Sequence, residues 1–222
     1  MWRRSGDGGW HRFLDRREAG ARLAQDLARY ASQNVLVLGI PRGGVVVAAE
    51  VARGLNAELD VVVARKLGAP HQPELAIGAV TADGVRYLDE EAVRALAVPP
   101  DYIERITAIE QAEARRREER YRDGRPPPRI EGRIVIVVDD GLATGATARA
   151  AARSVRRRTP AWLIIAAPVG AQQSVEALAE EADEIVCPYM PEPFYAVGLY
   201  YVEFSPVSDE EVEALLRPSH PA

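Results

Sequence analysis

The sequence of 222 residues predicts an α/β fold, an open parallel sheet flanked by helices on both faces. Short apolar runs of strand length recur along the chain and alternate with helical patterns. Continuous runs such as residues 134–138 (IVIVV) are typical of strands buried on both faces of a parallel sheet. No apolar run approaches the ~20 residues that a membrane-spanning helix needs. We therefore expect one domain over residues 1–222 and no membrane partner.

The first half of the chain carries the first two buried strands. Asp15 and Glu18 form a D-x-x-E capping box, which opens a segment with apolar residues at helical spacing. The Asp-Gly pair at residues 83–84 is typical of a hairpin turn. The predicted elements, in order, are a helix at 15–31, a strand at 34–40, a helix at 45–54, a strand at 60–64, and hairpin strands at 77–81 and 85–88.

Residues 83–132 are predicted to form an insert of a hairpin and helices within the single domain. Two prolines, Pro99 and Pro100, separate a short helix from a long one that starts at residue 101 and ends near residue 122. The long helix starts with an apolar edge that suits either the core or a partner chain, formed by Tyr102, Ile106 and Ile109. Its remainder favours a solvated helix, because acids and arginines form i,i+4 pairs at Asp101–Arg105, Glu113–Arg117 and Glu118–Arg122.

The second half continues the alternation of strand and helix. Ser208 and Glu211 form another capping box, which opens the last helix. The predicted elements are a strand at 134–138, a helix at 145–158, a strand at 162–167, a helix at 171–181, a strand at 184–187 and a helix from 208. In such sheets ligands bind beyond the carboxyl ends of the strands, so the first residues after each apolar run are the candidate site.

The strongest chemical signal is the segment 135–147, VIVVDDGLATGAT. Its apolar strand ends in two adjacent acids, Asp139 and Asp140, which are costly to bury unless a cation or hydrogen-bond donors meet them. The small residues that follow leave backbone N–H groups accessible at a helix N-terminus, and Thr144 and Thr147 add hydroxyl donors. Acids beside such an anion cradle suit a phosphorylated sugar, with carboxylates on its hydroxyls and amides on its phosphate.

Segment 135–147 resembles the fingerprint of the type I phosphoribosyltransferases, which is four apolar residues, two acids and a small-residue loop ending in T-G-x-T. The resemblance implies that Asp139 and Asp140 hold the ribose hydroxyls of 5-phosphoribosyl 1-diphosphate (PRPP) and meet a metal ion only indirectly, through those hydroxyls or water. It implies Mg²⁺ as the cofactor, a small hood beside the sheet and a homodimer. The residues implied to bind the 5′-phosphate are Ala143, Thr144, Gly145, Ala146 and Thr147.

Residues 39–44, GIPRGG, carry a second signal after the first predicted strand. Glycines let backbone amides approach an anion, and Arg42 adds a planar cation. Without the resemblance, an ordinary strand-to-helix turn explains these residues. With it, a diphosphate-binding loop is implied, as is a non-proline cis peptide at or just before Arg42. The residues of that loop are Pro41, Arg42, Gly43 and Gly44.

Arg65 and Lys66 carry a third signal, directly after the second predicted strand. Lys66 is the only lysine among the 28 basic residues of the chain. The resemblance implies that both side chains face the diphosphate and that a mobile loop, or its hinge, follows at residues 67–78. The alternative is a pair of strand-end charges that point to solvent.

Aromatic residues crowd the segment 188–207, where prolines favour a loop and the resemblance implies a hood. Aromatic rings on such a loop suit stacking on a flat base, although an aromatic satellite core is the alternative. The resemblance to purine-type members implies base binding by Phe194, Tyr195 and Val197. Ala143 stands where 6-oxopurine enzymes carry an acid, so we do not expect hypoxanthine or guanine, and the base stays unassigned.

Together these signals predict a pentosyltransferase of nucleotide salvage, which moves the phosphoribosyl group of PRPP to a nitrogenous base and releases diphosphate. The implied catalytic residues are Asp139, Asp140, Arg42 and Lys66. The alternatives are a regulatory protein that senses PRPP without turnover and a sugar-phosphate enzyme with convergent loops. A net charge of −5 argues against nucleic acid as a partner, and the single cysteine, Cys187, favours a reducing cytoplasm.

Overall fold

The computed structural model describes residues 12–217 and contains a five-stranded parallel sheet with the strand order β2-β1-β6-β7-β8. Neighbouring strands pair in parallel along the whole sheet, so that the carboxyl ends of all five strands lie at one edge. This sheet confirms the predicted fold class. The strands are β1 (Val35–Gly39), β2 (Glu58–Val61), β6 (Ile134–Val138), β7 (Trp162–Ala166) and β8 (Glu184–Val186).

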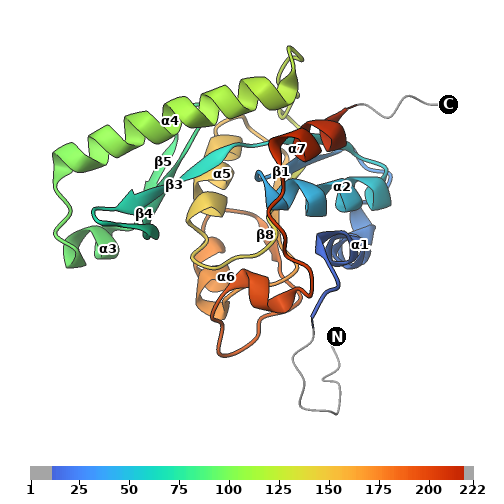
Figure 1. Cartoon of the computed structure of the whole chain (residues 1–222). Helices are drawn as coiled ribbons and strands as arrows, with labels where there is room; N and C mark the ends of the chain where they lie inside the picture. The colour runs from blue at the N-terminus through green and yellow to red at the C-terminus, as the bar shows by residue number, and fades with distance from the viewer. Residues whose placement is uncertain (1–11, 218–222) are drawn as a thin grey trace.

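Helices cover both faces of this sheet because alternate strand residues point to opposite sides (Figure 1). Val37 and Ile136 pack on one face against α1 (Arg16–Asp26), the short 3₁₀ helix at Ala28–Tyr30 that follows it, and α2 (Gly43–Leu55). Leu38 and Val137 pack on the other face against α5 (Ala146–Arg156) and α6 (Gln172–Leu178). The continuous apolar runs of the sequence therefore correspond to strands that are buried on both faces of the sheet.

A second, three-stranded antiparallel sheet lies beside the main one. It consists of β3 (Ala64–Ala69), β4 (Gln72–Thr81) and β5 (Arg86–Leu88), so the hairpin predicted around residues 83–84 is confirmed. The prediction that residues 67–78 form a loop is wrong, since β3 and β4 pair across most of this segment. The prediction of one strand at 60–64 is wrong as well, because the chain leaves the main sheet after Val61 and enters β3 at Ala64.

The long predicted helix is α4 (Pro100–Arg122), preceded by α3 (Glu90–Ala95). Figure 1 shows α4 running along the small sheet and reaching α7 (Asp209–Leu216). All three predicted i,i+4 ion pairs are present. The helix is nevertheless not simply solvated, because three of its own residues, Ile103, Ala114 and Tyr121, are buried. Of its apolar edge, Tyr102 and Ile106 pack against the small sheet and Ile109 is exposed.

Helix α1 begins at its predicted cap, since Asp15 Oδ1 accepts a hydrogen bond of 2.8 Å from the Glu18 N–H group. We expect Asp15→Ala to lower the free energy of unfolding by about 0.5–2 kcal/mol, because one N–H group of the first turn loses its partner. Urea unfolding monitored by circular dichroism measures this loss, with Asp15→Asn as the control that keeps a cap. An unchanged midpoint in Asp15→Ala would contradict the role of the cap.

Within residues 12–217, no helix is both long enough and apolar enough to cross a membrane. The longest, α4, has 23 residues but carries charge along most of its length. Part of that charge is paired, within the helix between Arg122 and Glu118 and across to α7 between Arg120 and Asp209.

Candidate active site

Two turns meet at the carboxyl edge of the main sheet, one after β1 and one after β6. These neighbouring strands bring Gly43 and Gly44 directly against the two acids. A Cβ atom on Gly43 would lie 1.9 Å from Asp140 Oδ2, and one on Gly44 would lie 3.1 Å from Asp139 Oδ1. The predicted diphosphate loop and the predicted sugar-binding acids therefore touch, and Gly43 must lack a side chain for them to do so.

Asp139, the first of the two acids, lies within reach of two hydrogen-bond donors. Its Oδ1 accepts a hydrogen bond of 2.8 Å from the Asp140 N–H group, and its Oδ2 lies 3.5 Å from the Thr147 hydroxyl. Burial raises the pKa of the Asp139 carboxyl well above its ordinary value, and the nearby Asp140 carboxylate raises it further. A carboxyl group whose pKa is raised by burial and by a neighbouring charge is typical of a functional site.

The turn after the acids leads into α5 as predicted. Gly145 caps that helix with a left-handed φ of 72°, a conformation that favours glycine. Ala143 and Thr144 are exposed, and the backbone oxygen of Ala143 accepts a hydrogen bond from Ser174. The first turn of α5 carries N–H groups without an intrahelical partner, which is the arrangement that binds phosphate groups elsewhere. One of them, the Ala146 N–H group, donates a long hydrogen bond of 3.4 Å to the Thr144 hydroxyl.

The three cations predicted to bind the diphosphate each pair with an acid of a different element. The Pro41–Arg42 peptide bond is cis, as expected, and the Arg42 side chain is partly exposed beside Asp209. Arg65 and Lys66 lie on β3, not after a strand of the main sheet. Arg65 pairs with Glu110 of α4 at 2.6 Å, and Lys66 pairs with Glu74 at 3.0 Å. The structure therefore unites residues 41–44 with residues 139–147, whereas it pairs both β3 cations with glutamates.

Arg16 is a site residue that the sequence did not reveal. Its Nε donates a hydrogen bond of 2.7 Å to Asp140 Oδ2, and its Nη1 donates one of 2.9 Å to the backbone oxygen of Ser205. Its guanidinium lies 3.8 Å from the centre of the Phe204 ring. No motif links residue 16 to residue 140, so only the folded chain could disclose this contact.

The segment 188–207 packs as an aromatic cluster beside the acids. Phe194 stacks on Tyr200 with a centroid distance of 5.2 Å, and the Tyr201 hydroxyl donates to the backbone oxygen of Asp140 at 2.6 Å. Val197, in the 3₁₀ helix Val197–Tyr200, lies against Gly141, while the Tyr195 side chain is 73% exposed. The satellite core that was the alternative is therefore present, and it borders the turn that carries the acids.

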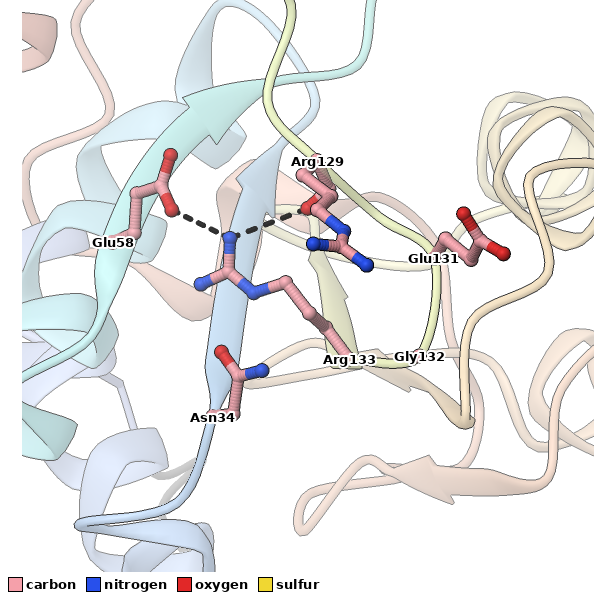
Figure 2. A pocket seen from close by; sticks show the side chains of 6 residues that line it. All are labelled: Asn34, Glu58, Arg129, Glu131, Gly132 and Arg133. Carbon is pink, nitrogen blue, oxygen red and sulfur yellow. Dashed lines mark hydrogen bonds and ion pairs between the residues drawn. The ribbon is translucent and has the colours of Figure 1, made fainter.

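A cavity of about 460 Å³ lies at the opposite edge of the main sheet (Figure 2). Its lining comes from residues that begin or precede the strands, where Arg133 donates hydrogen bonds to Glu58 and to the backbone oxygen of Arg129. The strands run away from this edge, so the cavity is separated from the acids by the length of the sheet. It takes no part in the site at the carboxyl edge.

Cys187 is not a nucleophile of this site, because burial raises the pKa of its thiol to about 12. We expect the folded chain to resist alkylation by iodoacetamide at pH 8, where the thiolate fraction is very small. Mass spectrometry of the treated protein measures the modification, and the same reaction in urea is the control that exposes the thiol. Rapid alkylation of the folded chain would contradict the assignment.

A parallel sheet that presents acids and glycine-rich turns at its carboxyl edge is an architecture of proteins that bind phosphorylated ligands. Within that class the chain belongs to the phosphoribosyl transferase family, since the profile of the phosphoribosyl transferase domain matches residues 9–201. Two curated proteins from strains of Mycobacterium tuberculosis, provisionally named phosphoribosyl transferases, are 47% identical over 208 residues. The match covers 94% of this chain and 47% of theirs, so the chain spans about half the length of these relatives.

Solved structures share the fold of this chain. TT1426 of Thermus thermophilus is 48% identical, with a TM-score of 0.77 over 92% of this chain and 97% of that chain. AQ2163 of Aquifex aeolicus is 13% identical, with a TM-score of 0.51 over 82% of this chain and 78% of that chain, and it shows the fold alone. The family supports a phosphoribosyl transferase function for the chain.

Proposed function

We propose that the chain binds PRPP with Mg²⁺ at the carboxyl edge of its main sheet and transfers the phosphoribosyl group to a nitrogenous base. The observation that carries the proposal is the contact between Gly43 and Asp140. PRPP needs carboxylates at its sugar hydroxyls and backbone N–H groups at its 5′-phosphate and its diphosphate. These groups must therefore lie within the length of one small ligand. That contact joins the two turns whose residue types fit these tasks.

Each part of the proposed site has a task in the transfer. Asp139 and Asp140 hold the ribose hydroxyls, and residues 143–147 hold the 5′-phosphate. The C1–O bond breaks with its electron pair on the diphosphate while a C1–N bond forms to the base, whose ring proton passes to diphosphate or solvent. Arg42 and the N–H groups of residues 43–44 stabilise the charge that grows on the diphosphate.

The acid pair suits a divalent ion, because carboxylate oxygens are the ligands that Mg²⁺ prefers. Within residues 12–217, however, no group of three or more His, Cys, Asp or Glu side chains is placed to hold a metal. Asp139 and Asp140 would therefore hold the ion indirectly, through the ribose hydroxyls or water. When bound with PRPP, Mg²⁺ supplies neutralisation of the leaving diphosphate.

For the base, we propose the space beside residues 194–197. Support comes from the contact of Val197 with Gly141, the residue that follows the acids, and from the exposed ring of Tyr195. Phe194 contributes through its stack on Tyr200, which fixes the segment.

A second candidate function is PRPP sensing without turnover. The observation that favours it is the pairing of Arg65 with Glu110 and of Lys66 with Glu74, because both cations predicted to face diphosphate are engaged elsewhere. Catalysis would require at least Lys66 to leave Glu74, whose side chain is almost fully exposed. A sensor would not require that rearrangement.

Isothermal titration with PRPP and Mg²⁺ tests binding, and release of diphosphate from PRPP with a panel of nucleobases separates the two functions. We expect saturable binding and, for one class of base, diphosphate release. Binding without release by any base would favour the sensor, and absence of binding would overturn both. Light scattering on the same preparation tests the proposed homodimer, whose mass is twice the 24.3 kDa of the chain.

A further inference from the structure

We propose that Arg16 is a positioning residue of the sugar-binding site, which fixes the Asp140 carboxylate and supplies the cation that the acid pair needs. The inference deepens the proposed function and rests on it. Arg16 lies on α1, far from both glycine-rich turns in the sequence, and reaches the acids only through the fold.

The geometry of Arg16 is that of a fixed side chain. It uses Nε for Asp140 Oδ2 at 2.7 Å and Nη1 for the Ser205 carbonyl at 2.9 Å, while its plane is covered by the Phe204 ring at 3.8 Å. Its side chain is 11% exposed. A planar guanidinium held on three sides presents its Nε–H in one direction, so it fixes the orientation of the carboxylate that it meets.

The contact between Arg16 and Asp140 also offsets negative charge at the proposed site. Asp139 and Asp140 are adjacent, and the charge on Asp140 raises the pKa of Asp139. PRPP would bring several further negative charges to the same place. An enclosed arginine on Asp140 offsets the charge of that carboxylate, so less repulsion meets the incoming ligand.

The position of Arg16 also places it at the diphosphate loop. A Cβ atom on Gly43 would lie 1.9 Å from Asp140 Oδ2 and 2.7 Å from Arg16 Nε. The loop backbone, the carboxylate and the guanidinium thus meet at one point. The Asp140 carboxylate lies directly against the backbone of Gly43. By fixing this carboxylate, Arg16 acts on both parts of the proposed PRPP site, the acids and the diphosphate loop.

Arg17 provides a matched control on the same helix. It is the next residue along the chain, its side chain is 51% exposed, and it pairs loosely with Glu50 at 3.6 Å and Glu211 at 3.8 Å. Arg17→Gln removes the same charge from the same helix without touching the acid pair. A loss that depends only on net charge would appear equally in both variants.

The test measures PRPP affinity with Mg²⁺ by titration calorimetry for wild type, Arg16→Gln, Arg16→Lys, Arg17→Gln, Asp140→Asn and the double variant Arg16→Gln/Asp140→Asn. We expect Arg16→Gln to weaken binding about tenfold to a hundredfold, since a charge-assisted hydrogen bond is lost. Arg16→Lys recovers only part, because an ammonium cannot reproduce the fork that meets Asp140 and Ser205. Arg17→Gln binds like wild type. Thermal unfolding of each variant checks that it is folded.

The double variant separates positioning from a merely structural role. If Arg16 acts through Asp140, Arg16→Gln adds less than about twofold in the Asp140→Asn background. Losses that simply multiply, or Arg16→Gln binding as tightly as wild type, overturn the inference while the proposed function stands. A wild-type chain that does not bind PRPP overturns the proposed function itself.

Discussion

Asp139→Asn is expected to weaken PRPP binding about a hundredfold and, at the same time, to raise the free energy of unfolding at neutral pH. Affinity falls because a neutral amide replaces the charged acceptor of a ribose hydroxyl. Stability rises because burial and Asp140 disfavour the Asp139 carboxylate, whereas an amide of nearly the same shape still accepts from the Asp140 N–H group. Calorimetry and urea unfolding measure the two quantities.

The stability gain should depend on pH in a defined direction. A raised pKa means that the folded chain holds the Asp139 proton more tightly than the unfolded chain does. The contribution of this carboxyl to stability is therefore full below the unfolded pKa and is lost as the pH rises through the folded pKa. The advantage of Asp139→Asn over wild type should be small near pH 4 and grow toward pH 8. Parallel pH profiles for the two proteins would contradict the assignment.

Arg122→Gln is expected to lower the free energy of unfolding by about 3–5 kcal/mol, the loss that follows when one partner of a buried ion pair is removed. Arg122 lies 3.2 Å from Asp60 and 3.1 Å from Glu118, and both the Arg122 and the Asp60 side chains are almost fully enclosed. Its Nη2 also donates to the backbone oxygen of Val61 at 3.3 Å. Without it, Asp60 would be left as an uncompensated buried charge.

Arg116→Gln is the control for that prediction, since Arg116 lies on the same helix and pairs with Glu113 at the exposed surface. Exposed pairs of this kind contribute less than about 1 kcal/mol. Chemical unfolding of the two variants should therefore give clearly different midpoints. Equal losses would mean that α4 is held to the core by something other than Arg122.

The main sheet was predictable because its strands are specified locally. Residues 134–138 lie between Arg133 and Asp139, and the structure begins and ends β6 at those same limits. The hairpin of β3 and β4 was not predictable in this way. Its sequence mixes glycine, proline and polar residues, and its apolar side chains Leu67 and Ile77 are buried by Ile103 of α4, which lies much later in the chain.

The same distinction between local and long-range signals applies to the candidate site. The acids and both glycine-rich turns are short continuous segments whose residue types already indicate their chemistry, and the fold brings residues 41–44 and 139–147 together. Arg65 and Lys66 were expected to face the diphosphate because of the resemblance to the family, and the structure pairs them with Glu110 and Glu74. Arg16 has no local signal, because its role depends on a helix that reaches the acids only in three dimensions.

The segment before α1 and the segment that follows the 3₁₀ helix Val197–Tyr200 are hydrogen-bonded to each other next to the acids. Phe13 receives a hydrogen bond from Val202 and donates one to Tyr200, and Glu203 donates to Leu14. Three residues beyond Phe13 the chain reaches Arg16, and three beyond Val202 it reaches Ser205. A substitution or cleavage within either of these paired segments would therefore act on the proposed site through only a few peptide units, and PRPP affinity is the measurement that would report it.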